Sequence, residues 1–294
     1  MQFEAHHLSA LAAVLRRGSF EVAAADLSVT PSAISQRIKA LEDRVGTSLI
    51  NRGSPCTGTR AGLRLAKHAE DVGVLESQLS RDLSLGETTG PARLRVAINA
   101  DSLATWFVAA MALAGDVLFD LVIDDQDHSA DWLKRGEVSA AVTSRAKPVT
   151  GCDAIPLGSL RYIATASPNF MQQWFATGVN ADTLALAPCL TFNAKDALQK
   201  VWIDRNFDQR LAPPTHFLPS SHAFVGAARA GVGWGLNPET LVRGPIRNAR
   251  LVPLLADAPL DVPLYWQISR IMAPALEPVT QAVRKAAQKV LIAP

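Results

Sequence analysis

The chain has 294 residues, a hydrophobic content of 48% and a formal net charge of +2. A chain of this length has room for about two folded domains with buried cores. Its small net charge argues against a protein that coats nucleic acid without selectivity, although a whole-chain total can hide a local basic patch.

Cysteine use and apolar patterning indicate the compartment. Cys56, Cys152 and Cys189 are scattered and lack the CxxC spacing of a zinc site, which fits a reducing cytoplasm. The N-terminus lacks the basic-then-apolar pattern of a signal peptide, and the longest apolar run, residues 104–115, is too short to span a bilayer. We therefore expect a soluble, cytoplasmic protein without a metal ion or cofactor.

Three short helices are predicted near the N-terminus. The first ends near Gly18, the second covers residues 22–27, and the tight connection Ser28-Val29-Thr30 leads into the third. Thr30 is placed to cap a helix that opens with Pro31. The buried face of this third helix has Ile34, Ile38 and Leu41 at i, i+4 and i+7, and its outward positions are Ser32, Ser35, Gln36, Arg37 and Lys39.

Two helices joined so tightly match the helix-turn-helix, whose second helix enters the major groove of DNA. From residue 31 to 67 the chain has seven lysines and arginines and two acidic residues, a local charge of +5. Residues 49–58 have the profile of a wing, two extended pieces around a turn, with Arg52 placed to contact phosphate. A small helical bundle with a solvated face is the alternative, but capping, periodicity and charge agree on DNA binding. The expected DNA-binding residues are Thr30, Pro31, Ser32, Ser35, Gln36, Arg37, Lys39 and Arg52.

A long helix without proline follows over residues 59–85. Its apolar stripe consists of Leu65, Ala69, Val72, Leu75, Leu79 and Leu83. We expect this stripe to pack on the same helix of a second subunit, because a two-fold dimer presents two recognition helices about one DNA turn apart. Packing on its own chain is the alternative. The Gly86–Pro91 segment then breaks the helix.

Beyond residue 91, strands alternate with helices. Strands are expected at residues 94–98, 118–123 and 140–143, with helices between them, and a second such block begins near residue 160. This pattern predicts two α/β lobes with a cleft beyond the carboxyl ends of their strands. The expected domains are residues 1–58, residues 59–90 as linker helix and hinge, and residues 91–294.

The chain resembles the LysR family of bacterial transcriptional regulators over its full length. The match is carried by FEVAAADLSVTPSAISQRIKALE (residues 20–42), by the wing end at residues 59–62, and by the two-lobed region. Within the family it is similar to the ArgP/LysG branch, which controls export of lysine and arginine, at NADSLATW (99–106), RGEV (135–138) and LYW (264–266). Gly58 departs from the leucine that many members have in the wing.

This resemblance implies an all-α winged helix-turn-helix domain joined to a two-lobed α/β effector domain like the periplasmic binding proteins. It also implies a regulator without enzymatic activity. The partners that it implies are double-stranded promoter DNA, a basic amino acid, RNA polymerase and a second copy of the chain. Dimer versus tetramer, and activation versus repression, stay open, as does a LysR-type regulator that senses a different metabolite.

The residues themselves indicate a ligand with a carboxylate and a distal cation. Residues 99–102 lie where the first strand gives way to a helix, so free backbone N–H groups can receive a carboxylate. Residues 116–131 contain six aspartates and no lysine or arginine, an anionic partner for an ammonium or guanidinium group. An ordinary helix cap and solvated carboxylates are the alternatives. The expected ligand-binding residues are Ala100, Asp101, Ser102, Asp125, Asp127 and Thr143, and we expect Trp106, Trp234 and Trp266 to be core residues.

Two other classes of function are disfavoured. An enzyme with a nucleophilic serine needs an arrangement such as the G-x-S-x-G elbow, which is absent, and Gly231–Gly235 lacks the G-x-G-x-x-G spacing of a dinucleotide site. An architectural DNA-bending protein has no use for about two hundred residues of cleft-forming lobes.

Overall fold

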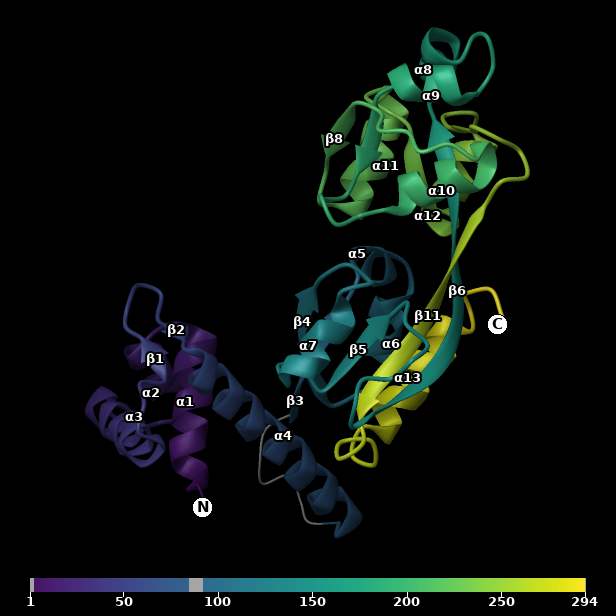
Figure 1. Ribbon diagram of the computed structural model, residues 1–294. Coiled ribbons are helices and arrows are strands. Elements are labelled where there is room, and N and C mark those ends of the chain that lie inside the picture. The colour runs from purple at the N-terminus through teal and green to yellow at the C-terminus, as the bar shows by residue number, and fades with distance from the viewer. Residues whose placement is uncertain (1–2, 85–91, 294) are drawn as a thin grey trace.

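The computed structural model describes residues 3–84 and 92–293, so the predicted break at residues 86–91 lies outside the described residues. The N-terminal part is helical with a small two-stranded wing (Figure 1). Its elements are α1 (Ala5–Arg17), α2 (Phe20–Asp26), α3 (Pro31–Val45), β1 (Ile50–Asn51), β2 (Thr57–Gly58) and α4 (Arg60–Asp82). The first three helices share one apolar core with the start of α4.

Helix α3 forms as its sequence predicts. The Thr30 hydroxyl accepts a hydrogen bond from the Ala33 amide at 3.2 Å, and Pro31 occupies the first turn. The helix ends where Gly46 takes a left-handed backbone with φ of 77°. Ile34, Ile38 and Leu41 are completely buried, which confirms the predicted inward face.

The wing explains why a glycine stands at position 58. An added Cβ on Gly58 would lie 2.8 Å from Leu63 Cγ and 2.9 Å from Leu15 Cδ1, so α1 and α4 approach too closely for a larger residue. At Gly62 an added Cβ would lie 1.9 Å from the Leu49 carbonyl oxygen. The wing therefore packs directly on α1 and α4.

Helix α4 splits its apolar stripe between two environments. Leu65 and Ala69 pack against the N-terminal core, and Val74, on an adjacent face of the helix, joins the core of the α/β region. Towards the C-terminal end of the helix, Leu79 and Leu83 are 57% and 59% exposed. Packing on the same chain thus accounts for the first half of the stripe, and the described residues leave most of Leu79 and Leu83 exposed.

Polar contacts fix α4 on the α/β region of the same chain. Asp71 Oδ1 accepts a hydrogen bond from Ser139 Oγ at 2.7 Å. Arg64 Nη1 donates to the Arg135 carbonyl oxygen at 3.0 Å. Helix α4 therefore contacts both the N-terminal helical core and the α/β region that follows it.

The first lobe is built on a parallel core of three strands. Its elements are β3 (Ala92–Ile98), α5 (Ala100–Ser102), the π-helical turn η1 (Leu103–Phe107), α6 (Val108–Leu113), β4 (Val117–Ile123), α7 (Ser129–Arg135), β5 (Ala140–Thr143) and α13 (Glu277–Ala287). Strand β3 lies between β4 and β5 and is parallel to both. The helix expected between the first two strands begins at Ala100 and contains the π turn, a rare feature that is frequent near functional sites.

Two long antiparallel strands, β6 (Cys152–Ala166) and β11 (Leu260–Ser269), run from the first lobe into the second (Figure 1). Their register shifts between Leu264 and Tyr265. Opposite this point Gly158 has φ of 119°, and an added Cβ would lie 2.4 Å from the Ile292 carbonyl oxygen. Bulges bend strands locally, so this is the bend between the lobes.

The second lobe completes the sheet from the other end of β6. Its elements are α8 (Pro168–Trp174), α9 (Ala181–Leu186), β7 (Cys189–Thr191), α10 (Leu198–Phe207), β8 (Thr215–Phe217), α11 (Ser221–Ala230), β9 (Gly235–Pro238), α12 (Glu239–Arg247) and β10 (Val252–Pro253). Both β9 and β10 pair with β6. Trp106, Trp234 and Trp266 are at most 1% exposed, which confirms that they are core residues. None of the helices in the described residues is long and apolar enough to cross a membrane.

Candidate functional site

The outer face of α3 is open to solvent. Thr30, Pro31, Ser32, Ser35, Gln36 and Lys39 are all exposed. Arg37 is only partly exposed. The structure therefore gathers six of the predicted residues on one accessible helix face, with Arg37 at its edge.

Arg52 belongs to the same surface through the wing. It follows β1 and is exposed. Its guanidinium lies 5.7 Å from the centre of the Phe20 ring, at the start of α2. The wing and the helix-turn-helix are thus in contact through this side chain, and both present polar or basic groups outward.

Two small cavities lie where the lobes face each other. The first has a volume of about 30 Å³ and the second about 20 Å³. The first lobe supplies Asn99, Ala100, Asp101, Asp124, Asp125 and Gln126, and the second lobe supplies Phe192, Asp196, Leu198, Ser221, Phe224, Leu236, Asn237 and Pro238. Because Asp101 and Asp196 line both cavities, the two cavities form one cleft. Its walls contain four carboxyl groups, those of Asp101, Asp124, Asp125 and Asp196.

Asp101 is tied to the strand that joins the lobes. Tyr162, on β6, donates a hydrogen bond from its hydroxyl to Asp101 Oδ2 at 2.9 Å. Burial raises the pKa of Asp101, and its hydrogen bonds oppose this effect in part. Burial, together with the charge of Asp101, raises the pKa of Tyr162 well above its usual value. Among the described residues, the ionised form of Asp101 thus has no positive partner.

Asp124 has such a partner. Burial acts to raise its pKa, but hydrogen bonds from Trp132, the Asp125 amide and Lys195 outweigh it, and the net pKa is lowered. Trp132 Nε1 lies 2.9 Å from Asp124 Oδ2, and Lys195 Nζ lies 3.1 Å from Asp124 Oδ1. Asp124 is therefore ionised and paired.

The remaining two carboxyl groups are held by backbone amides. Asp125 Oδ1 accepts from the Asp127 amide, and the two oxygens of Asp196 accept from the amides of Phe192 and Leu198, each at 2.9 Å. Burial nevertheless raises the pKa of both Asp125 and Asp196. A cation beside such groups would favour their ionised forms, because it offsets the effect of burial.

Of the six residues predicted to bind ligand, Ala100, Asp101 and Asp125 come together in the cleft, and the other three do not line it. Ser102 is fully buried behind Asp101 in the helix. Thr143 is also fully buried, and its hydroxyl accepts a hydrogen bond from the Arg145 amide at 3.1 Å. Asp127 is exposed and accepts a hydrogen bond from Ser144. A position at a strand end thus gives proximity without fixing the direction of the side chain.

Sequence reasoning missed the contributions of the second lobe. Tyr162, Asp196 and Ser221 reach the cleft from elements that lie more than fifty residues from Asp101 in the sequence. Ser221 follows the capping residue Ser220 at the start of α11, so a polar helix start was the one signal available. Asp196 had a weaker signal still, as an isolated acidic residue just before α10.

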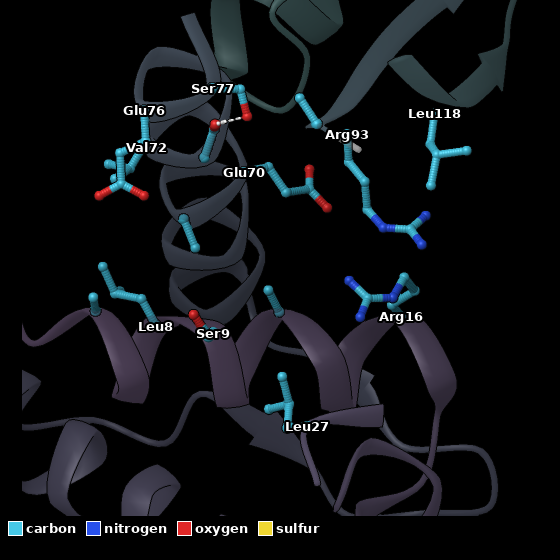
Figure 2. Close-up of a pocket in the computed structure, with 15 residues that line it drawn as sticks. Leu8, Ser9, Arg16, Leu27, Glu70, Val72, Glu76, Ser77, Arg93 and Leu118 are labelled. Atoms are coloured by element: carbon cyan, nitrogen blue, oxygen red, sulfur yellow. Dashed lines mark hydrogen bonds between the residues drawn. The ribbon is translucent and has the colours of Figure 1, made fainter. Parts of the chain in front are cut away.

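A larger cavity of about 500 Å³ lies between α1, α4 and the edge of the first lobe. The ionisable ends of Arg16, Glu70 and Arg93 surround it (Figure 2). Burial raises the pKa of Glu70, and Arg95 and Arg16 act in the opposite direction. No sequence pattern indicated this cavity, because three separate segments form it.

One group in the described residues has the geometry of a metal site. Glu4, His6 and His7 place their ligand atoms within 4.8 Å of one another at the start of α1. Glu4 Oε2 lies 3.2 Å from His6 Nε2, and both side chains are about half-exposed. A contact between exposed side chains on the protein surface accounts for this arrangement.

Comparisons with known proteins assign both halves of the chain. Residues 5–63 match the family described as "Bacterial regulatory helix-turn-helix protein, lysR family", and residues 89–288 match "LysR substrate binding domain". The crystal structure of ArgP from Mycobacterium tuberculosis is 43% identical, covers 100% of both chains and has a TM-score of 0.79.

Two comparisons concern Corynebacterium glutamicum. Its full-length LysG with bound effector Arg is 35% identical, covers 99% of this chain and 100% of that one, and has a TM-score of 0.66. Its "Lysine export transcriptional regulatory protein LysG" is 39% identical over 95% of this chain and 96% of that one. These relatives are regulators and not enzymes, which confirms the predicted class and fold. The chain belongs to the LysR family of bacterial transcriptional regulators, in the branch that includes LysG and ArgP.

Proposed function

We propose that this regulator reads promoter DNA with α3 and the wing, and that its activity responds to lysine or arginine bound between the two lobes. Its target is a gene for the export of basic amino acids. The observation that carries the effector proposal is the group of four carboxyl groups, Asp101, Asp124, Asp125 and Asp196, in the walls of one interlobe cleft.

The charge of the cleft favours a cationic ligand. A desolvated ammonium or guanidinium group needs anionic hydrogen-bond acceptors, and three of the four carboxyl groups have a raised pKa because burial leaves their charge uncompensated. The same carboxyl groups, when ionised, would repel an anionic metabolite. A regulator for a different, acidic metabolite is therefore disfavoured, and the arginine held by the LysG of C. glutamicum has the favoured charge.

The DNA-binding proposal rests on the exposed face of α3. Ser32, Ser35 and Gln36 offer hydrogen bonds near the N-terminal end of the helix, where base edges are read in a helix-turn-helix. Lys39 and Arg52 flank them and are positioned for phosphates, which supply salt-dependent affinity. RNA polymerase stays a predicted partner, and we expect the protein in the cytoplasm because bacterial promoter DNA lies there.

We also propose that two copies pair through α4. In an antiparallel two-fold pair centred on Glu76, Leu79 and Leu83 of one copy would lie against Gly73 and Ala69 of the other. Both of these positions line the large cavity, and an added Cβ on Gly73 would meet no atom within 4 Å. The exposed half of the stripe and the cavity beside the other half are thus complementary.

Calorimetric titration tests the effector proposal. The purified protein is titrated with L-arginine, L-lysine and L-citrulline, the last of which replaces the guanidinium with a neutral group of similar shape. We expect binding of arginine or lysine and at least tenfold weaker binding of citrulline, because the carboxyl groups lose their cationic partner. Equal binding of citrulline, or no binding of either basic amino acid, would refute the effector assignment. Footprinting upstream of its own gene and of neighbouring exporter genes tests the target.

A further inference from the structure

A lysine of the chain itself crosses the cleft. Lys195 follows β7 in the second lobe, and its Nζ lies 3.1 Å from Oδ1 of Asp124, at the end of β4 in the first lobe. This ammonium group therefore stands beside the acidic walls that the proposed function assigns to a cationic effector.

The backbone around Lys195 is shaped by hydrogen bonds within its own loop. The Lys195 amide donates a hydrogen bond to Asn193 Oδ1 at 2.8 Å. The carboxylate of the next residue, Asp196, accepts hydrogen bonds from the amides of Phe192 and Leu198. Such Asx contacts fix a turn. Lys195 thus starts from a defined position at the mouth of the cleft rather than from a freely moving loop.

The cleft is too small for an amino acid while the lobes are held in this way. Its two cavities, about 30 and 20 Å³, suit one or two water molecules. Phe192, Asp196 and Leu198, from the same loop and the start of α10, line both of them. An arriving ligand must therefore move the segment that bears Lys195.

We propose that Lys195 is a tethered cation that pairs with Asp124 in the effector-free protein, holds the lobes together and competes with the cationic group of the effector. This inference rests on the proposed binding of a basic amino acid in the cleft. When the effector enters, its cation takes the place of Lys195 near Asp124, and the loop of Lys195 is released. The device raises the effector concentration at which the regulator responds.

The size of the effect follows from exposure. The side chain of Lys195 is 53% exposed and that of Asp124 is 17% exposed, so solvent screens the pair. Ion pairs of this kind shift an equilibrium by about twofold to fivefold. Removing the competitor should tighten effector binding by that factor.

The test is a double-mutant cycle on the full chain, read by calorimetric titration with L-arginine. We expect Lys195→Met to tighten binding by about twofold to fivefold and Lys195→Arg to leave it near the wild-type value, because a guanidinium can pair with Asp124 as well. In an Asp124→Asn background, Lys195→Met should change the affinity by less than about 1.5-fold. Lys200→Met, at an exposed lysine on α10, controls for the loss of one positive charge from the same lobe.

The outcomes separate this inference from the proposed function. Weaker arginine binding by Lys195→Met would mean that Lys195 binds the effector, and it would overturn the inference. Unchanged binding, or an equal gain from Lys200→Met, would overturn it as well, with the effector site left standing. If the wild-type protein binds no arginine, both proposals fail.

Discussion

The pairing of two chains through α4 makes a quantitative prediction. Burial of a whole leucine side chain contributes about 1.5–3 kcal/mol. Leu79 and Leu83 are 57% and 59% exposed, so covering the remaining surface contributes about 1 kcal/mol or more for each. A two-fold dimer contains four such side chains, which together stabilise it by about 4 kcal/mol. Replacing both leucines by serine should therefore raise the dimer dissociation constant by about a thousandfold.

Sedimentation equilibrium over a range of protein concentrations measures this constant directly. The matched control is Leu186→Ser, because Leu186 is 67% exposed on α9, far from α4 in the chain. A second readout is the affinity for DNA with one and with two half-sites: the Leu79→Ser/Leu83→Ser protein should lose the advantage of the second site. A double variant that dimerises as tightly as the wild type would refute the pairing, and so would a wild-type protein that is monomeric at every concentration.

The remaining expectations concern the helix-turn-helix and the interlobe cleft. Thr30→Ala should lower the free energy of unfolding by about 1 kcal/mol in denaturant titrations, with most of the loss restored by Thr30→Ser, since the hydroxyl caps α3. Arg37→Ala should weaken binding of promoter DNA in gel-shift assays by several-fold and leave the arginine titration unchanged. Asp101→Ala should do the reverse; equal damage to both functions from either change would contradict the division of labour. Because burial raises the pKa of three cleft carboxyl groups above about 3.8, their contribution to stability is complete below that pH and is lost as pH rises through the raised values. A bound cation favours their ionised forms, so arginine should bind more tightly as pH rises through this window and should release protons, measured by calorimetry in buffers of different ionisation enthalpy.

Elements with strong local signals could be predicted from the sequence. Helix α11 (Ser221–Ala230) has such signals at both ends, because Ser220 caps its start and Gly231 takes a left-handed backbone at its end. Helix α12 was missed, since Pro245 lies inside it and argues against a helix there. Strand β6 was predicted to be much shorter than it is, because Gly158 in its middle interrupts the pattern where the strand passes between lobes.

The residues of the candidate site likewise fall into those with a local sequence signal and those that depend on the packing of the two lobes. The acidic groups that follow β3 and β4 were predicted, because the carboxyl ends of adjacent parallel strands meet at one edge of a sheet. Which aspartate faces the cleft depends on the turn after each strand, so the structure has Asp124 rather than Asp127 beside Asp125 in the cleft wall. The groups of the second lobe depend on how the lobes close on each other, and that is a property of the bend in β6 and β11.

Helix α7 connects the proposed effector cleft to α4, the helix that follows the helix-turn-helix and the wing. At its start, the amides of His128 and Ser129 donate to the Asp125 carbonyl oxygen, each at 2.9 Å. At its end, the Arg135 carbonyl oxygen accepts the hydrogen bond from Arg64 on α4. A ligand that draws the end of β4 towards the second lobe therefore moves a short rigid element whose other end is attached to α4. The influence on DNA binding is limited by the difference in effector affinity between the two arrangements, and DNA must change effector affinity by the same factor. A regulator of this design consequently needs a cleft that binds its effector well in one arrangement and poorly in the other.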